Sequence, residues 1–182
     1  MKIMKTIWNL VSGLLVTVVV LLAVALVGVR VVGLQPFAVL SGSMEPVYST
    51  GDLIYVKSVD YRELEAGDVI TFMLSENTVA THRVVGVVPD ETDSSVLRYR
   101  TKGDANDAED GTLVHYKNII GSPVFSLPKL GYVAAYISSP PGMYVAIGCC
   151  AMLILLVFLP DVFAEEEPRK QEEKKTGKYV RK

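Results

Sequence analysis

The sequence is poor in the side chains that bind metals and form disulfides. Its 182 residues include only two histidines and two cysteines. Cys149 and Cys150 are adjacent inside an apolar run, and adjacent cysteines seldom reach relaxed disulfide geometry, so we interpret them as apolar filler. Structural zinc needs three or four ligands, whereas His82 and His115 lie far apart in the chain. We therefore expect no metal site and no cofactor.

Charge is absent from a long stretch near the N-terminus. Residues 6–29 carry no charged side chain, and about 20 apolar residues suffice to cross a bilayer. Ala23 and Ala25 imitate the small residues of a signal-peptide cleavage site, but the apolar run continues past them. The pattern favours an uncleaved anchor, with residues 1–34 forming a cytoplasmic N-terminus and a first transmembrane helix.

A second stretch without charge lies between Lys129 and Asp161. The sequence Ser-Ser-Pro-Pro-Gly at 138–142 interrupts it, so we predict a second transmembrane helix over 143–160. A buried core helix is the alternative, but the central block of the chain is too small to cover one. Residues 161–182 are highly charged without an apolar period and are predicted to be a cytoplasmic tail.

The remaining charges indicate how the chain is oriented. Basic residues dominate residues 1–34 and recur in the tail, and loops rich in lysine and arginine stay in the cytoplasm. Both termini are therefore expected in the cytoplasm of a two-span protein of the cell membrane, or of the endoplasmic reticulum membrane in a eukaryote. Residues 35–142 are then extracytoplasmic. With 8 basic and 14 acidic residues this block would repel phosphates, which excludes nucleic acid as a partner.

The central block has the pattern of β-structure. Short runs rich in β-branched and aromatic residues alternate with Gly-Asp pairs and acidic turns, and no helical period of similar strength appears between residues 35 and 129. The predicted strands are 53–56, 69–72, 79–88, 96–101 and 119–125. An all-β or mostly β domain follows.

The same block contains few candidates for nucleophilic catalysis. Ser41 and Ser43 lie in a small-residue loop, and a serine nucleophile needs a neighbouring base. His82 and His115 are the two histidines available, and a buried neutral lysine is a third possibility.

A carboxylate that orients the base would come from the loop at 102–111. This loop also has the composition of a solvated acidic turn, and it lacks the glutamate of the strict calcium-loop pattern. Spacing does not choose among its acids, which are Asp104, Asp107, Glu109 and Asp110.

Taken in order, these segments resemble type I signal peptidases. The resemblance covers roughly residues 36–142 and both apolar runs. Ala105 departs from it, since many members have asparagine there. The matching segments are Ser-Gly-Ser-Met-Glu-Pro at 41–46, Gly-Asp-Leu-Ile at 51–54, Gly-Asp-Val-Ile at 67–70, Thr-His-Arg-Val-Val-Gly at 81–86, Lys-Gly-Asp-Ala-Asn at 102–106 and Pro-Lys-Leu-Gly-Tyr at 128–132.

The resemblance also implies roles for individual residues. Typical bacterial members have lysine where this chain has His82, which places it with the Ser-His-Asp branch found in archaea, the endoplasmic reticulum and some sporulating Gram-positive bacteria. By resemblance, Ser43 is the nucleophile, His82 the general base, Asp110 its orienting acid and Asp104 a supporting acid. The Ser43 backbone N–H and the Ser41 hydroxyl are the implied oxyanion hole.

The resemblance implies a mostly β extracytoplasmic catalytic domain of the signal-peptidase fold, over residues 35–142, flanked by two transmembrane helices. The implied activity is that of a membrane-bound serine endopeptidase that cleaves signal peptides from exported preproteins after small residues. Expected partners are preproteins, membrane lipid and the secretion translocon. Two alternatives are a peptidase dedicated to a narrow client set and an inactive membrane-anchored binding subunit. The second is disfavoured because all three catalytic-type residues are present.

Overall fold

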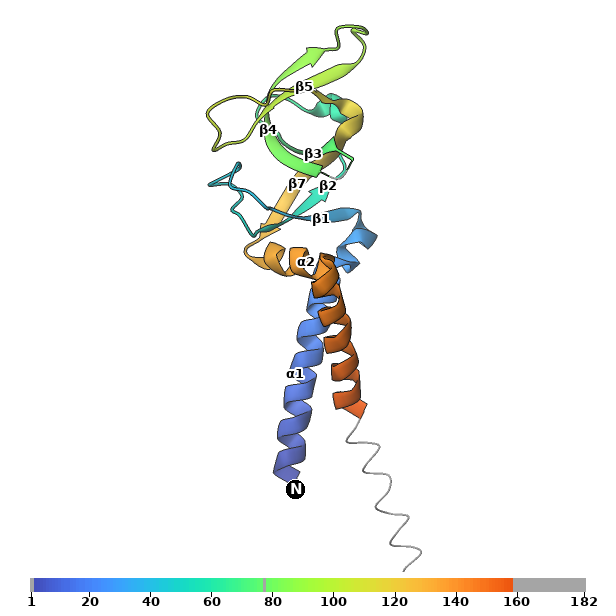
Figure 1. The fold of residues 1–182 in the computed structure, drawn as a ribbon. Helices are drawn as coiled ribbons and strands as arrows, with labels where there is room; N and C mark the ends of the chain where they lie inside the picture. Colours follow the sequence, from blue (N-terminus) through green and yellow to red (C-terminus); the bar gives the residue numbers. More distant parts are fainter. Residues whose placement is uncertain (1, 77, 159–182) are drawn as a thin grey trace, which may run out of the picture. The chain divides into compact units, whose positions relative to one another are not determined.

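The computed structural model describes residues 2–76 and 78–158 (Figure 1). The chain divides into a helical unit, which contains residues up to Leu22 and from Pro140 onward, and a sheet unit, Ala23–Ser139. The predicted charged tail at 161–182 lies outside the described residues.

The sheet unit is built on one antiparallel sheet of seven strands in the order β1-β2-β7-β3-β4-β5-β6. Strand β7 lies between β2 and β3 and so connects the part of the sheet formed by β1 and β2 to the part formed by β3, β4, β5 and β6. At Gly121 on β7, a Cβ atom would lie 2.0 Å from the Lys57 carbonyl oxygen, so this crossing requires glycine. The strands are β1 (Leu34–Ala38), β2 (Leu53–Lys57), β3 (Val69–Ser75), β4 (Thr78–Pro89), β5 (Leu97–Lys102), β6 (Val114–His115) and β7 (Ile119–Leu127).

Short helices complete the sheet unit. The 3-10 helices are η1 (Gly28–Val32), η2 (Tyr61–Glu63) and η3 (Tyr116–Asn118), and the α-helix α2 (Leu130–Ser138) follows β7.

The mostly β character predicted from the sequence is confirmed. Each of the five predicted strands overlaps an observed one, whereas β1 and β6 were not predicted. Strand β1 contains Pro36, which cannot donate a ladder hydrogen bond and is tolerated because β1 is at the sheet edge. Strand β6 has only two residues, too few for an alternating pattern.

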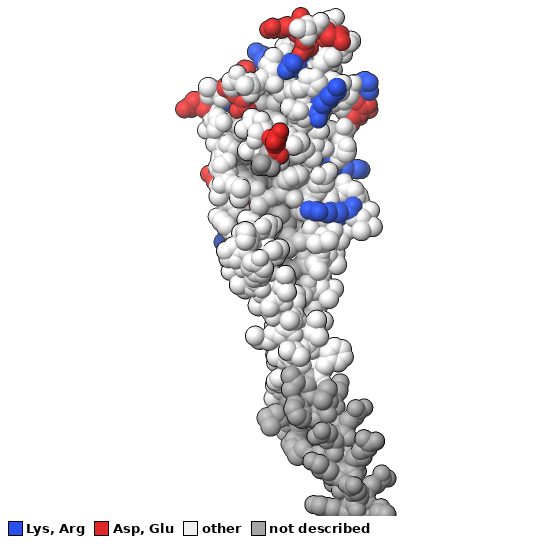
Figure 2. All heavy atoms as spheres, turned by 45° about the vertical axis from the view of Figure 1, so that its right-hand side comes forward, with Lys and Arg blue, Asp and Glu red and all other residues white. Residues whose placement is uncertain are grey.

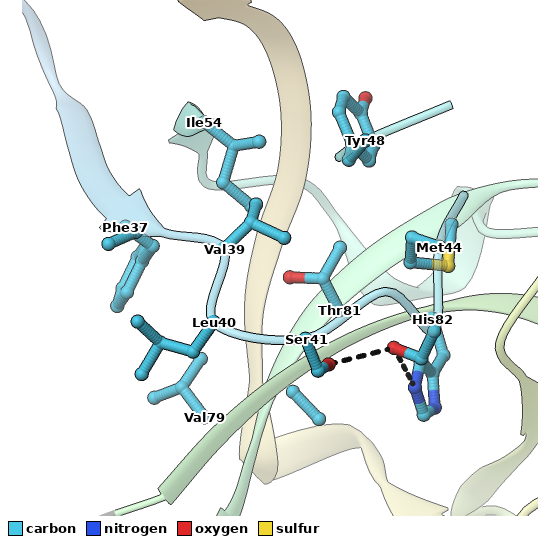
Figure 3. A pocket seen from close by; sticks show the side chains of 13 residues that line it. Phe37, Val39, Leu40, Ser41, Met44, Tyr48, Ile54, Val79, Thr81 and His82 are labelled. Atoms are coloured by element: carbon cyan, nitrogen blue, oxygen red, sulfur yellow. Dashed lines mark hydrogen bonds between the residues drawn. The ribbon is translucent and has the colours of Figure 1, made fainter. Parts of the chain in front are cut away.

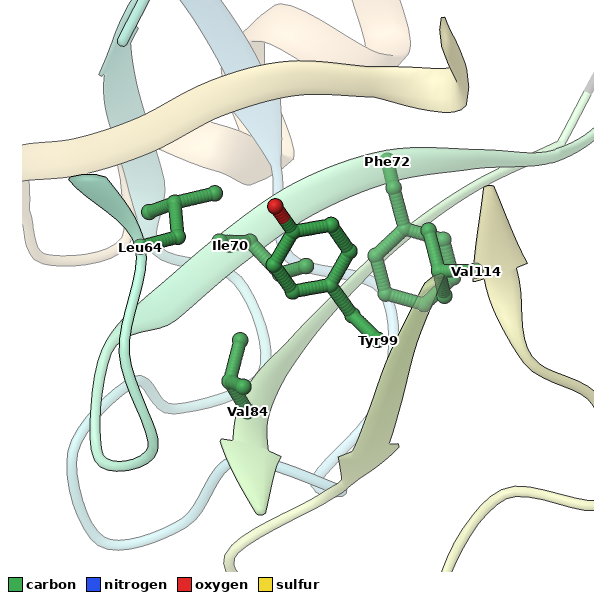
Figure 4. Packing of buried hydrophobic residues seen from close by; sticks show 6 residues of the cluster. All are labelled: Leu64, Ile70, Phe72, Val84, Tyr99 and Val114. Carbon is green, nitrogen blue, oxygen red and sulfur yellow. The ribbon is translucent and has the colours of Figure 1, made fainter. Parts of the chain in front are cut away.

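The principal core cluster lies over β3, β4, β5 and β6 (Figure 4). Ile70, Phe72, Val84 and Tyr99 are each at most 2% exposed. The Tyr99 hydroxyl donates to the Tyr61 carbonyl, which satisfies the polar end of a buried ring. Leu64 and Val114 complete the cluster. This packing holds the first half of β4, from which a candidate base projects.

Two apolar helices form the helical unit, and the first of them continues past Leu22 into the sheet unit. Helix α1 (Lys2–Leu26) runs into η1, and the apolar helical stretch Thr6–Val32 has 27 residues. A second helix, Pro140–Phe158, has 19 residues. Their most apolar segments are almost entirely exposed, as expected for surfaces that face lipid. By length and composition, both helices are long enough to cross a membrane.

The second apolar helix begins earlier in the chain than the predicted 143. Pro140 and Pro141 stand at its start rather than interrupting it. Proline is favoured in the first turn of a helix because the N–H groups there have no intrahelical acceptor. The helix is therefore three residues longer at this end than the sequence pattern indicated.

We predict that Ile70→Ala lowers the free energy of unfolding by about 2–5 kcal/mol, because it opens a cavity in the core cluster. Met73→Ala on the same strand is the matched control, since Met73 is 42% exposed, and it should cost less than about 1 kcal/mol. Denaturant unfolding in detergent micelles measures both. Equal losses in the two variants would contradict the assignment of the core.

Candidate active site

The loop between β1 and β2, residues 39–52, carries the two candidate serines. Backbone hydrogen bonds close its base, from Val39 N to the Asp52 carbonyl at 2.8 Å and from Gly51 N to the Val39 carbonyl at 2.8 Å. Met44 is 2% exposed and anchors the loop, and its carbonyl accepts from the backbone N–H of Tyr48 at 3.0 Å. These contacts fix the backbone on the C-terminal side of Ser43.

His82 projects from β4 towards this loop. The first half of β4, Thr78–Arg83, is paired with β3, with His82 opposite Ile70. The Phe72 ring meets the imidazole edge-on, with ring centroids 6.2 Å apart. His82 Nε2 lies 3.2 Å from Ser43 Oγ (Figure 3). A histidine base is thus within hydrogen-bond reach of a serine hydroxyl.

Asp110 lies on the other side of the imidazole, in the loop between β5 and β6. Its Oδ2 is 2.6 Å from His82 Nδ1. The same oxygen accepts a 2.6 Å hydrogen bond from the Thr101 hydroxyl, and Asp110 N donates to the Thr101 carbonyl at 2.8 Å. With Nδ1–H donated to Asp110, Nε2 is the nitrogen left to accept the Ser43 proton.

Asp104 has a different partner. Both of its carboxylate oxygens bind the Arg83 guanidinium, at 2.8 and 2.6 Å, and Arg83 also donates to the Gly67 carbonyl at 2.7 Å. The structure therefore brings Asp110, and not Asp104, to the His82 ring. The Arg83 hydrogen bonds lower the pKa of Asp104, against the opposing effect of its burial.

The turn that contains Asp104 is packed against loop 39–52, which carries Ser43. Ala105 N donates to the Ser43 carbonyl at 2.9 Å, and a Cβ atom on Gly103 would lie 2.6 Å from that same carbonyl oxygen. Only glycine permits this approach. The loops that carry Ser43 and Asp110 are therefore in direct contact.

The remaining candidates lie apart from this arrangement. His115 accepts a hydrogen bond from Lys117 N and stacks on Tyr116, which indicates a structural role. Glu109 pairs with Arg100 at the surface. Among the described residues no cluster of potential ligands suited to a metal ion is found.

A cavity of about 160 Å³ opens beside Ser43 and His82 (Figure 3). The Ser41 hydroxyl is 3.3 Å from Ser43 Oγ at its edge. Tyr48 also lines this cavity, and burial raises the pKa of its hydroxyl, an effect that Arg83 opposes. The lining is otherwise mainly apolar and comes from the end of β1, loop 39–52, β2 and the start of β4: Phe37, Ala38, Val39, Leu40, Met44, Ile54, Val79, Ala80 and Thr81.

Comparison with known proteins assigns the family. The model of the family described as signal peptidase, peptidase S26, matches residues 11–96. The catalytic subunit of the signal peptidase complex of Fusarium vanettenii is 34% identical over 128 residues, which cover 65% of this chain and 73% of the fungal protein. The chain belongs to the signal peptidase family.

Other relatives of the family are bacterial and animal. Signal peptidase I W of Bacillus subtilis is 40% identical over 124 residues, which span 64% of each chain. A human catalytic subunit of the signal peptidase complex is 31% identical over 111 residues, or 57% of each chain. The resemblance inferred from the motifs is thereby confirmed.

Sequence reasoning missed two contacts of this signal peptidase homologue. It gave Thr101 no role, although the side chain is fully buried and donates to Asp110. It also did not pair Arg83 with Asp104. A threonine near the end of a strand is common and does not by itself indicate a role. Thr101 could have been identified only from the strand order, which places β5 beside β4 and so brings Thr101 close to His82 and Asp110.

We predict that Asp104→Asn lowers stability at neutral pH by about 1–3 kcal/mol, through loss of the charge-assisted hydrogen bonds to Arg83. Because the pKa of Asp104 is lowered in the folded state, its stabilising effect is present above the unfolded value of about 4 and is lost as pH falls through the folded one.

The difference between wild type and Asp104→Asn should therefore shrink below about pH 4. Thermal unfolding in detergent at neutral and acid pH measures it. A difference independent of pH would show that the Asp104 charge does not contribute.

Proposed function

We propose that this chain is a membrane-bound serine endopeptidase that cleaves signal peptides from exported preproteins after small residues. Ser43 acts as nucleophile, His82 as general base and Asp110 as the acid that orients His82. The observation that carries the proposal is the continuous chain of contacts from Asp110 Oδ2 through the His82 ring to Ser43 Oγ.

The reaction follows from this geometry. His82 Nε2 takes the proton of Ser43 Oγ as the oxygen attacks the scissile carbonyl, and Asp110 stabilises the imidazolium that results. The Ser43 N–H and the Ser41 hydroxyl receive the developing oxyanion. His82 then protonates the leaving amine, and a water molecule hydrolyses the acyl-enzyme by the same steps.

The substrate is held as an extended strand. Strand β1 ends the sheet order, so one of its edges has no neighbouring strand within the described chain. A peptide added along that edge passes through the cavity between β1 and the start of β4. The mainly apolar lining favours the small side chains that precede a cleavage site.

The two apolar helices keep the sheet unit at the membrane. The charge distribution of the sequence supports cytoplasmic termini and an extracytoplasmic sheet unit. Enzyme and signal peptide then share one bilayer, which raises their effective concentration and orients the scissile bond. The preprotein, membrane lipid and the translocon are the partners this arrangement requires.

Processing of a tagged preprotein in membranes tests the triad. Ser43→Ala, His82→Ala and Asp110→Ala should each reduce cleavage by about a thousandfold or more, because the three residues act as a unit. Asp107→Ala is the matched control, since Asp107 is an exposed acid in the same loop as Asp110, and it should cleave at the wild-type rate. Wild-type rates in all the triad variants would refute the proposal.

We further predict that Thr101 positions Asp110. Thr101→Val keeps the shape of the side chain but removes the hydroxyl, and should lower kcat about tenfold with KM unchanged. Thr101→Ser keeps the hydroxyl and should restore most of kcat. Steady-state kinetics on a preprotein separates a positioning role of Thr101 from a packing role, since a residue needed only for packing would tolerate valine better than serine.

A further inference from the structure

Helix α2 has an unusual surface for the exterior of a protein domain. Its inner face is apolar, with Leu130, Ala134 and Ile137 partly buried. Its outer face consists of Tyr132, Val133 and Tyr136, which are 57%, 37% and 53% exposed. A helix that faces water carries charged or strongly polar residues on its outer side, and α2 has no charged residue at all.

The chain that follows α2 indicates what covers this face. Only Ser139 separates the end of α2 from the apolar helix that begins at Pro140. One residue spans less than about 4 Å, so the C-terminus of α2 lies wherever that helix starts. If the apolar helix crosses a bilayer, the end of α2 is at the bilayer surface. With 9 residues, or about 14 Å, α2 is too short to cross it.

The chemistry of the exposed face agrees with the lipid–water boundary. Tyrosine is enriched there, because its ring prefers the apolar side and its hydroxyl the headgroups. Apart from Lys129, which is exposed and directly precedes α2, the charged side chains of the sheet unit that are visible in one view lie elsewhere. Figure 2 shows them mainly towards the end of this unit where the β4–β5 turn lies, with much of the visible face uncharged.

We propose that α2 lies in the interfacial layer of the membrane, with Val133, Tyr136 and the exposed side of the Tyr132 ring against lipid, and that it is the lipid-docking surface of the sheet unit. The occupant of this surface is the headgroup and upper acyl region of the bilayer. Capture of another protein by the same face is the competing outcome that the experiment below distinguishes.

Helix α2 packs against loop 39–52, which carries Ser43. A Cβ atom on Gly131 would lie 2.2 Å from the Asp52 carbonyl oxygen, and one on Gly51 would lie 2.0 Å from the Tyr132 ring. The Tyr132 hydroxyl also donates to the Thr50 carbonyl at 3.2 Å. The first turn of α2 thus packs on the turn that closes loop 39–52. A fixed depth of α2 in the bilayer therefore sets the height of Ser43 above the bilayer. The importance of this height for cleavage rests on the proposed function, whereas the depth of α2 does not.

Fluorescence of a single tryptophan in full-length protein tests the depth. The chain has one tryptophan, so Trp8→Phe provides a silent background, combined with Ser43→Ala to exclude any effect of catalysis. Tyr136→Trp reports on α2, and Thr92→Trp in the exposed β4–β5 turn is the control. Both are reconstituted in phosphatidylcholine vesicles whose acyl chains are brominated either near the carbonyl or near the terminal methyl.

The proposal expects blue-shifted emission from Trp at 136, quenched at least twofold more by lipid brominated near the carbonyl than by the deeper label, and no quenching at 92. Emission at 136 as red-shifted and as unquenched as at 92 would overturn it. Blue-shifted emission without quenching by either lipid would also overturn it, because protein rather than lipid would then cover the face.

A second measurement addresses the consequence for cleavage. Tyr136→Asp places a charge on the exposed face without disturbing the core, and should slow cleavage of a membrane-embedded preprotein several-fold. Cleavage of a short soluble peptide in detergent should be unchanged, and Tyr136→Phe should behave as wild type in both assays. Equal loss on both substrates, or on neither, would refute the link between α2 and the height of Ser43. Inactivity of the wild type would instead refute the proposed function.

Discussion

The hydrogen bond between Asp110 and His82 is the interaction on which the rest of the site depends. It selects the imidazole tautomer, and the tautomer decides which nitrogen faces Ser43. Asp110 Oδ2 accepts from both His82 and Thr101, so the carboxylate has little freedom to turn away. An imidazole that is to accept a proton at Nε2 needs this orientation.

The position of Ser43 is set by contacts from three directions. Met44 is buried beneath the loop, Ala105 donates to the Ser43 carbonyl, and the Gly51–Asp52 turn closes the loop against α2. The Arg83–Asp104 pair holds the turn that contains Ala105, so Asp104 is linked to Ser43 through this turn and not through the His82 ring. Of the four acids among which spacing could not choose, Asp104 and Asp110 thus have distinct partners in the fold.

Much of this arrangement could be predicted from the sequence. The alternation of β-branched residues gave the long strands, and the motifs placed Ser43, His82 and Asp110 in a consistent order. Strand β1 was not predicted, because it has only five residues and contains a proline, which is not typical of a strand. The pairing of Arg83 with Asp104 and the hydroxyl of Thr101 could not be inferred, because both depend on which strands are neighbours and on side-chain direction across β4 and β5. The start of the second apolar helix was missed because two prolines suggest a break as readily as a first turn.

The close approach of Gly103 to the Ser43 carbonyl has a further consequence for how the sequence can vary. A methyl group at position 103 would lie 2.6 Å from that oxygen, so every other amino acid at this position would push the two loops apart. The spacing between Ser43 and the turn at 103–106 is therefore set by backbone atoms, and side-chain exchange at position 103 cannot adjust it.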